Sequence, residues 1–216
     1  KFNVMSKLFE SNMVRELLEE ILPRWSLSKG NVTIRNGGEF EEMDLLVADP
    51  ASRTLLVCEL RWMLQPGDPR EVQNRKKVCR KKVDQLQRKV HWLRTRVATA
   101  LSVLGLENSR EEEWEVQGVV VIQTFGGTLS RSEEFPIMTA RLFALGITQA
   151  TSLRQFATWS PSLRWLPQEN VHFRVVPQEV QLDVLGKRLV VSGIEKLCSV
   201  KAYTEFVTQS LLPVGR

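Results

Sequence analysis

The chain has 216 residues, enough for one medium-sized domain or for a core with an appendage. Hydrophobic residues make up 43% and charged residues 25%, an ordinary globular balance, and no apolar run approaches the roughly 18 residues of a membrane-spanning helix. The net charge is +5. Between residues 70 and 96, eleven basic residues stand against two acids, which gives this segment +9 and leaves the rest at −4. That concentration predicts a polyanion partner, nucleic acid first, and no membrane.

The cysteines indicate a cellular setting. Cys58, Cys79 and Cys198 are widely spaced and form no Cys-x-x-Cys pair, and only two histidines accompany them. This argues against a zinc site and favours a reducing, intracellular location, cytoplasmic or nucleoid/nuclear. No signal peptide is visible, but the chain begins at Lys1 without a methionine. A piece of a larger multidomain protein therefore stays an open interpretation.

The first half of the chain predicts a helix, a three-stranded meander and a long helix. Phe9, Met13, Leu17 and Ile21 recur at four-residue spacing, as on one face of a helix. Turn signals at residues 36–38 and 49–52 separate the strands. The expected ranges are 4–22 for the first helix, 32–35, 40–48 and 54–63 for the strands, and 71–104 for the long helix.

The second half alternates strands and helices after a charged linker at residues 107–113. We expect a buried strand at 116–125, a helix at 137–145, a short strand at 147–150, a helix at 153–159 capped by Ser152, a hairpin of 180–185 with 188–191, and a closing helix at 194–211. This order predicts a mixed α/β fold with a central sheet. The predicted domains are a core at 1–160 and an extension at 161–216 packed on it, whose role as a dimerisation, specificity or covering element stays open.

Two carboxylates stand inside neighbouring predicted strands. Asp44 lies in the second strand, and Glu59 lies in the apolar third strand, where an unpaired charge would be costly. A hairpin about residues 49–53 places Asp44 opposite Glu59, and Arg61 emerges on the same face as Glu59. Facing carboxylates beside a cation can hold an oxygen-preferring divalent metal, for which Mg²⁺ is the natural candidate.

These residues resemble the PD-(D/E)XK, or restriction-endonuclease-like, superfamily of metal-dependent nucleases. Its motif has an Asp on one strand of a hairpin and Asp/Glu-x-Lys on the next, matched here by Asp44 in Glu-Met-Asp-Leu-Leu and by Glu59-Leu60-Arg61. The resemblance covers roughly residues 5 to 160. It implies a central mixed sheet flanked by helices, to which the hairpin and last helix would be an extension.

The resemblance also implies roles for individual residues. Glu10 best matches the acid of the first helix, with Glu16 or Glu19 as fallbacks, and Lys82 and Gln85 match polar site positions on the long helix. Mg²⁺, or Mn²⁺, would be held by Glu10, Asp44 and Glu59. Arg61 stands where the family usually has Lys, and because Arg stays protonated it is a poor general base. Lys82 is a candidate replacement.

The basic helix predicts contacts to phosphates. The residues expected to bind nucleic acid, DNA before RNA, are Arg75, Lys76, Arg80, Lys81, Lys82 and Lys89. The plainer interpretation is a solvated charged face. The scarcity of acidic residues in this segment argues against it, because a solvated helix normally carries charges of both signs.

The sequence thus predicts a metal-dependent nuclease. The main alternative is an inactive nuclease-like fold that binds nucleic acid or a protein, and an unrelated α/β interaction domain is a third. At residue level, the alternative is an edge-strand Asp44 facing solvent and a Glu59 paired with Arg61 or Arg35. Whether the chain forms a homodimer is left open.

Overall fold

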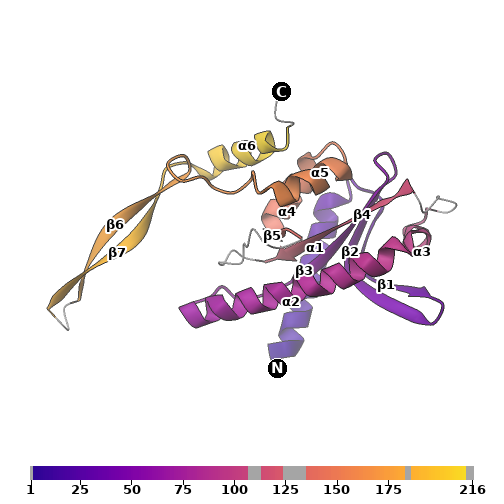
Figure 1. Cartoon of the computed structure of the whole chain (residues 1–216), viewed down its shortest axis with the longest axis horizontal. Helices are drawn as coiled ribbons and strands as arrows, with labels where there is room; N and C mark the ends of the chain where they lie inside the picture. The colour runs from indigo at the N-terminus through magenta and orange to yellow at the C-terminus, as the bar shows by residue number, and fades with distance from the viewer. Residues whose placement is uncertain (1, 107–112, 124–134, 183–185, 213–216) are drawn as a thin grey trace. The chain divides into compact units, whose positions relative to one another are not determined.

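The computed structural model describes residues 2–106, 113–123, 135–182 and 186–212, and the chain divides into two compact units, Lys1–Ser162 and Leu163–Arg216. Figure 1 shows the helices and strands of both units, which are described separately below.

The first unit is built on a five-stranded sheet. Its elements are α1 (Phe2–Ile21), β1 (Ser28–Asn36), β2 (Glu39–Asp49), β3 (Thr54–Arg61), α2 (Pro69–Arg94), α3 (Val97–Val103), β4 (Glu115–Ile122), β5 (Ile137–Thr139), α4 (Ala140–Gln149), α5 (Leu153–Trp159) and the 3-10 turn η2 (Ser160–Ser162). The strands lie in chain order, with β1, β2 and β3 antiparallel and β3, β4 and β5 parallel. The predicted mixed α/β class with a central sheet is confirmed.

Helices cover both faces of this sheet, and Figure 1 shows α2 in front of it and α1 behind. On the α2 face, alternate residues of β2 and β3 form one apolar core with the helix; its members include Leu46, Ala48, Leu55, Val57, Val83, Leu86 and Val90. On the other face α1 lies so close to β1 that a Cβ on Gly30 would come within 2.3 Å of Val14 Cγ1. The central strands β3 and β4 are therefore buried on both sides, as was predicted for the strand now identified as β4.

The second unit contains β6 (Phe173–Leu182), β7 (Lys187–Lys196) and α6 (Val200–Ser210). The two strands pair antiparallel over their full length, from Phe173 opposite Lys196 to Leu182 opposite Lys187. Ser199 caps α6 by accepting a hydrogen bond from the backbone N–H of Ala202. The predicted hairpin is confirmed but longer, and its residues 183–185 lie outside the described residues.

The long helix predicted for residues 71–104 is two helices. Thr95 and Arg96 leave helical geometry between α2 and α3, and Arg96 turns back to donate to Glu39 Oε2 at 2.7 Å while lying over the Trp92 ring. The apolar spacing continues through the break, since Leu93, Val97 and Leu101 all join the core. For that reason the sequence pattern did not reveal it.

Three other predictions of elements were wrong. Residues 137–139 are the strand β5, which pairs with β4, and α4 begins only at Ala140, capped by Thr139. Residues 147–149, predicted as a strand, belong to α4. The closing helix starts at Val200 because residues 194–196 pair within β7. Residues 107–112 of the predicted linker and 124–125 of the predicted strand lie outside the described residues.

Candidate functional site

Asp44 and Glu59 come together where the β2–β3 pairing ends. The ladder runs from Asp49 opposite Thr54 to Leu45 opposite Cys58, so the next position on each strand is one of the two carboxylates. Asp44 Oδ2 accepts a hydrogen bond from the backbone N–H of Leu60 at 2.7 Å. β2 lies between β1 and β3, so the alternative of a solvent-facing Asp44 on an edge strand does not apply.

The backbone is irregular beside Asp44. The β1–β2 ladder pairs Gly30 with Leu45 and Val32 with Met43, and Asn31 between them has a left-handed φ of 51°. Met43 joins the same core as Leu46, which regular alternation along β2 would not allow. The side-chain alternation of β2 therefore shifts at Asp44. Only the Gly-Asn dipeptide at residues 30–31 signals this in the sequence.

Glu59 is buried, 2% exposed, and both of its carboxylate oxygens are bound by lysines of α2. Lys82 Nζ lies 2.5 Å from Oε1, and Lys89 Nζ lies 2.6 Å from Oε2. The two lysines are seven residues, or about two helical turns, apart and so lie on one face of α2. Two cations therefore offset the free-energy cost of burying this carboxylate. They are lysines, and not Arg61 or Arg35, which the alternative interpretation had paired with Glu59.

The pKa of Asp44 is raised from 3.8 to about 6. Burial is the largest cause and the negative charge of Glu59 the second; Lys89, Lys82 and the Leu60 N–H partly offset them. Burial and the neighbouring charge of Glu59 therefore disfavour the ionised form of Asp44, and a cation bound beside Asp44 would offset that cost.

Glu10 and Arg61 form a separate ion pair. Arg61 donates to Glu10 Oε1 at 2.7 Å, which links β3 to α1. Among the residues that the structure describes, no three His, Cys, Asp or Glu side chains gather to form a metal site. The expected ligand set of Glu10, Asp44 and Glu59 is thus not brought together, although the two strand carboxylates alone are a donor set that Mg²⁺ uses when water and phosphate complete the shell.

The basic residues of α2 fall into two groups. Lys76, Arg80 and Lys81 are exposed, as expected of phosphate contacts, and Gln85 is also exposed. Arg75 and Lys89 differ from the expectation because both are buried; Arg75 donates to the backbone oxygen of Met63 at 3.0 Å. Lys82 is bound to Glu59.

Part of the positive charge of α2 is neutralised by the neighbouring strand. Arg88 pairs with Glu41 at 2.5 Å, and Arg96, just after the helix, pairs with Glu39 at 2.7 Å. The acidic residues before Asp44 therefore neutralise cations near the helix's C-terminal end. The exposed positive charge that remains for a polyanion lies mainly in the N-terminal half.

A cavity of about 410 Å³ adjoins the Glu10–Arg61 ion pair, because Arg61 is part of its lining. The sequence analysis did not predict this cavity. It lies among the start of α1, the end of β3 and the first turns of α2, and its lining includes Ser6, Arg61, Trp62, Gln65, Asn74 and Val78. The Trp62 ring is stacked on Phe9, with centroids 4.5 Å apart. The only signal in the sequence was an aromatic residue directly after the motif.

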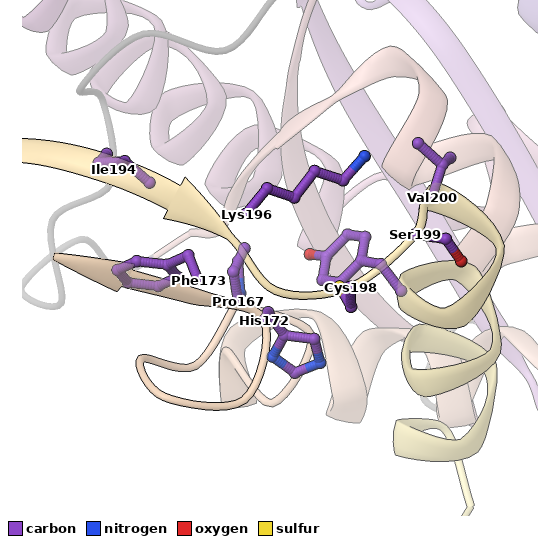
Figure 2. Close-up of a pocket in the computed structure, with 9 residues that line it drawn as sticks. Pro167, His172, Phe173, Ile194, Lys196, Cys198, Ser199 and Val200 are labelled. Atoms are coloured by element: carbon purple, nitrogen blue, oxygen red, sulfur yellow. The ribbon is translucent and has the colours of Figure 1, made fainter. Parts of the chain in front are cut away.

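The second unit has an apolar cavity of about 410 Å³ of its own, shown in Figure 2. Phe173 and Ile194 come from the two strands, Cys198 precedes α6, Val200 is the first residue of α6, and the Lys196 side chain extends along one wall. Tyr203, which also lines the cavity, donates to the backbone oxygen of Trp165 at 2.5 Å.

Comparison with protein-family models, curated proteins and solved structures gave no match to this chain. Within the described part of the chain, no helix combines the length and the apolar character needed to cross a membrane. The functional interpretation therefore rests on the residues of the site.

Proposed function

We propose that the first unit is a restriction-endonuclease-like domain that hydrolyses phosphodiester bonds of nucleic acid with a divalent metal, Mg²⁺ or Mn²⁺. The observation that carries this proposal is the meeting of Asp44 and Glu59 at the end of the β2–β3 ladder, with a pKa of about 6 for Asp44. A carboxylate whose pKa is perturbed by burial and by a neighbouring charge is typical of functional sites.

In this proposal Asp44 and Glu59 are the residues that hold the metal. When bound, the ion supplies Lewis-acid stabilisation of the phosphate and lowers the pKa of an attacking water. Glu59 would exchange one of its lysine contacts for the ion, which leaves an ammonium group beside the reacting phosphate. Lys82, the less buried of the two lysines, is suited to that role.

Glu10 and Arg61 have a different part in the proposal. Glu10 positions Arg61 through their ion pair, and the guanidinium of Arg61 stabilises negative charge on the phosphate. The exposed Lys76, Arg80 and Lys81 hold the strand through more distant phosphates without reading its sequence.

Cleavage of single-stranded, duplex and branched DNA and of RNA, with Mg²⁺, Mn²⁺ or EDTA, tests the proposal. Asp44→Asn should lower the metal-dependent rate at least ~100-fold, since losing even an outer-shell partner of a metal ligand typically costs 10–100-fold. The matched control is Glu42→Gln, an exposed acid on the same strand, which should keep the rate. Absence of cleavage by the wild-type chain with either metal would overturn the proposal.

A second candidate is an inactive nuclease-like fold that binds nucleic acid or a protein. It is favoured by the saturation of the site: both oxygens of Glu59 are bound by lysines, and Arg61 is paired with Glu10. Calorimetric titration with Mn²⁺ separates the two. The enzyme should bind Mn²⁺ in a manner lost in Asp44→Asn, whereas the inactive module should show no binding that depends on Asp44.

A further inference from the structure

We propose that the cavity at the end of β3 is a subsite for one unpaired nucleotide, so that the site takes nucleic acid that is single-stranded at this position. The inference rests on the proposed function and deepens it by naming the substrate class. Four features of the described residues carry it: the place of the cavity, its walls, its rigidity and its charge.

Asp44 and Glu59 are not part of the cavity lining, but two elements connect the lining to Glu59 and to its partner Lys82. On β3, Arg61 lines the cavity two residues after Glu59, a step of roughly 7 Å. On α2, Val78 lines it one turn before Lys82, a step of about 6 Å along the helix axis. A nucleotide whose phosphate lies at Glu59 and Lys82 can therefore place its base in the cavity.

The walls suit a flat aromatic ring with polar edges. Trp62 lines the cavity, and its stack on Phe9 holds the indole in place. Met63, Pro66 and Val78 add apolar surface. The amides of Gln65 and Asn74, also in the lining, can donate and accept hydrogen bonds at a base edge.

The loop that forms one wall is held from α2, so the cavity is formed before a ligand arrives. Arg75 donates to the Met63 backbone oxygen at 3.0 Å, and Glu71 accepts from the Gly67 N–H at 2.6 Å. Asp68 then caps α2 by accepting from the Glu71 N–H at 2.8 Å. A preformed site binds with a smaller cost of ordering. This explains the burial of Arg75.

The charge at the cavity favours a nucleotide over a neutral ring. The lining carries two arginines, Arg61 and Arg75, against one acid, Glu71. Arg61, about one-third exposed, also belongs to the candidate site through its ion pair with Glu10. A base inside a duplex is stacked on both sides and cannot enter such a cavity unless it is unpaired and turned out. Single strands, loops and frayed ends already have unpaired bases, so they meet this condition without the free-energy cost of opening a base pair.

The experiment measures binding of fluorescent 12-nucleotide single strands, and of the matching duplex, by anisotropy in EDTA, where cleavage does not interfere. One base at a time is removed to leave an abasic sugar. The wild-type chain should bind the single strand more tightly than the duplex, and one abasic position should weaken binding by about 5- to 100-fold. This measurement needs no variant that could fail to fold.

Trp62→Leu should bind the intact strand as weakly as wild type binds the abasic one and should no longer respond to base removal, while Trp62→Phe should keep the response. Trp92→Leu, a tryptophan on α2 outside the cavity lining, is the matched control and should leave the response intact. Equal responses at all positions, or a duplex bound as tightly as the single strand, would overturn the subsite while metal-dependent cleavage keeps the proposed function. No binding to any nucleic acid would overturn the subsite, and absence of cleavage with Mg²⁺ or Mn²⁺ would overturn both.

Discussion

The candidate site of the first unit and the apolar cavity of the second are held together by different forces. In the first unit, Glu59 and two lysines make ion pairs below the surface, beside a second carboxylate. In the second, Phe173, Ile194 and Val200 line the cavity, and the half-buried phenol of Tyr203 donates a hydrogen bond to a backbone oxygen. Buried charges cost free energy that apolar residues would not, so they favour a chemical role for the first region.

The largest expected difference between the two regions is the reactivity of their cysteines. Cys58 is fully buried in β3, and burial, followed by the charges of Asp44 and Glu59, raises its thiol pKa well above the ordinary value. Cys198 is half-buried and lines the apolar cavity. Ellman's reagent should therefore modify Cys198 at least ~100-fold faster than Cys58 or Cys79 in the native protein.

Cys198→Ser is the control for that measurement and should leave no rapidly reacting thiol. A rapid reaction of Cys58 would show that β3 opens readily, and the contrast between a tightly closed charged region and an accessible apolar one would then be wrong.

The next effect concerns the paired charges. Lys89→Met removes one buried cation from Glu59 and should lower the free energy of unfolding by about 3 kcal/mol, measured by urea denaturation. Lys81→Met, an exposed lysine on the same helix, is the matched control and should change it by less than about 0.5 kcal/mol. Equal effects of the two substitutions would mean that the Glu59 pair does not stabilise the fold.

Asp44 should make stability fall as pH rises. Because its native pKa of about 6 exceeds the ordinary 3.8, the native state keeps a proton that the unfolded state releases between about pH 4 and pH 6. Asp44→Asn, measured in EDTA, should therefore raise the free energy of unfolding by about 1–3 kcal/mol at pH 8. The gain should disappear below about pH 3, where the carboxyl is protonated in both states. A constant difference across this range would contradict the raised pKa.

The smallest expected effect lies in the second unit. Tyr203→Phe removes the hydrogen bond to the backbone oxygen of Trp165 and should cost about 1 kcal/mol in thermal unfolding. Burial raises the Tyr203 pKa to about 12, so this effect should be the same from pH 6 to pH 9. Glu205→Gln, an exposed neighbour on α6, should have no measurable effect. A strong dependence on pH would show that charges hold this region too.

Local patterns predicted much of this fold. The four-residue spacing of α1 and the turn between β2 and β3 identified elements that the structure confirms, and the hairpin register predicted that Asp44 and Glu59 meet. The break between α2 and α3 could not be predicted, because apolar spacing continues through it and the Arg96 contact with Glu39 joins residues far apart in the chain. The strand β5 was not predicted for a similar reason: it is defined by its pairing with β4, which is distant in the chain.

The sequence by itself determined that two carboxylates stand in adjacent strands and that a basic helix follows, because register and periodicity depend on neighbours along the chain. Only the tertiary structure decided which charges face the sheet. It directs Lys82 and Lys89 to Glu59, buries Arg75 to hold a loop, and leaves Lys76, Arg80 and Lys81 exposed. A charge near the sheet needs a partner and a charge in water does not, so a count of charges along the chain could not separate the two groups.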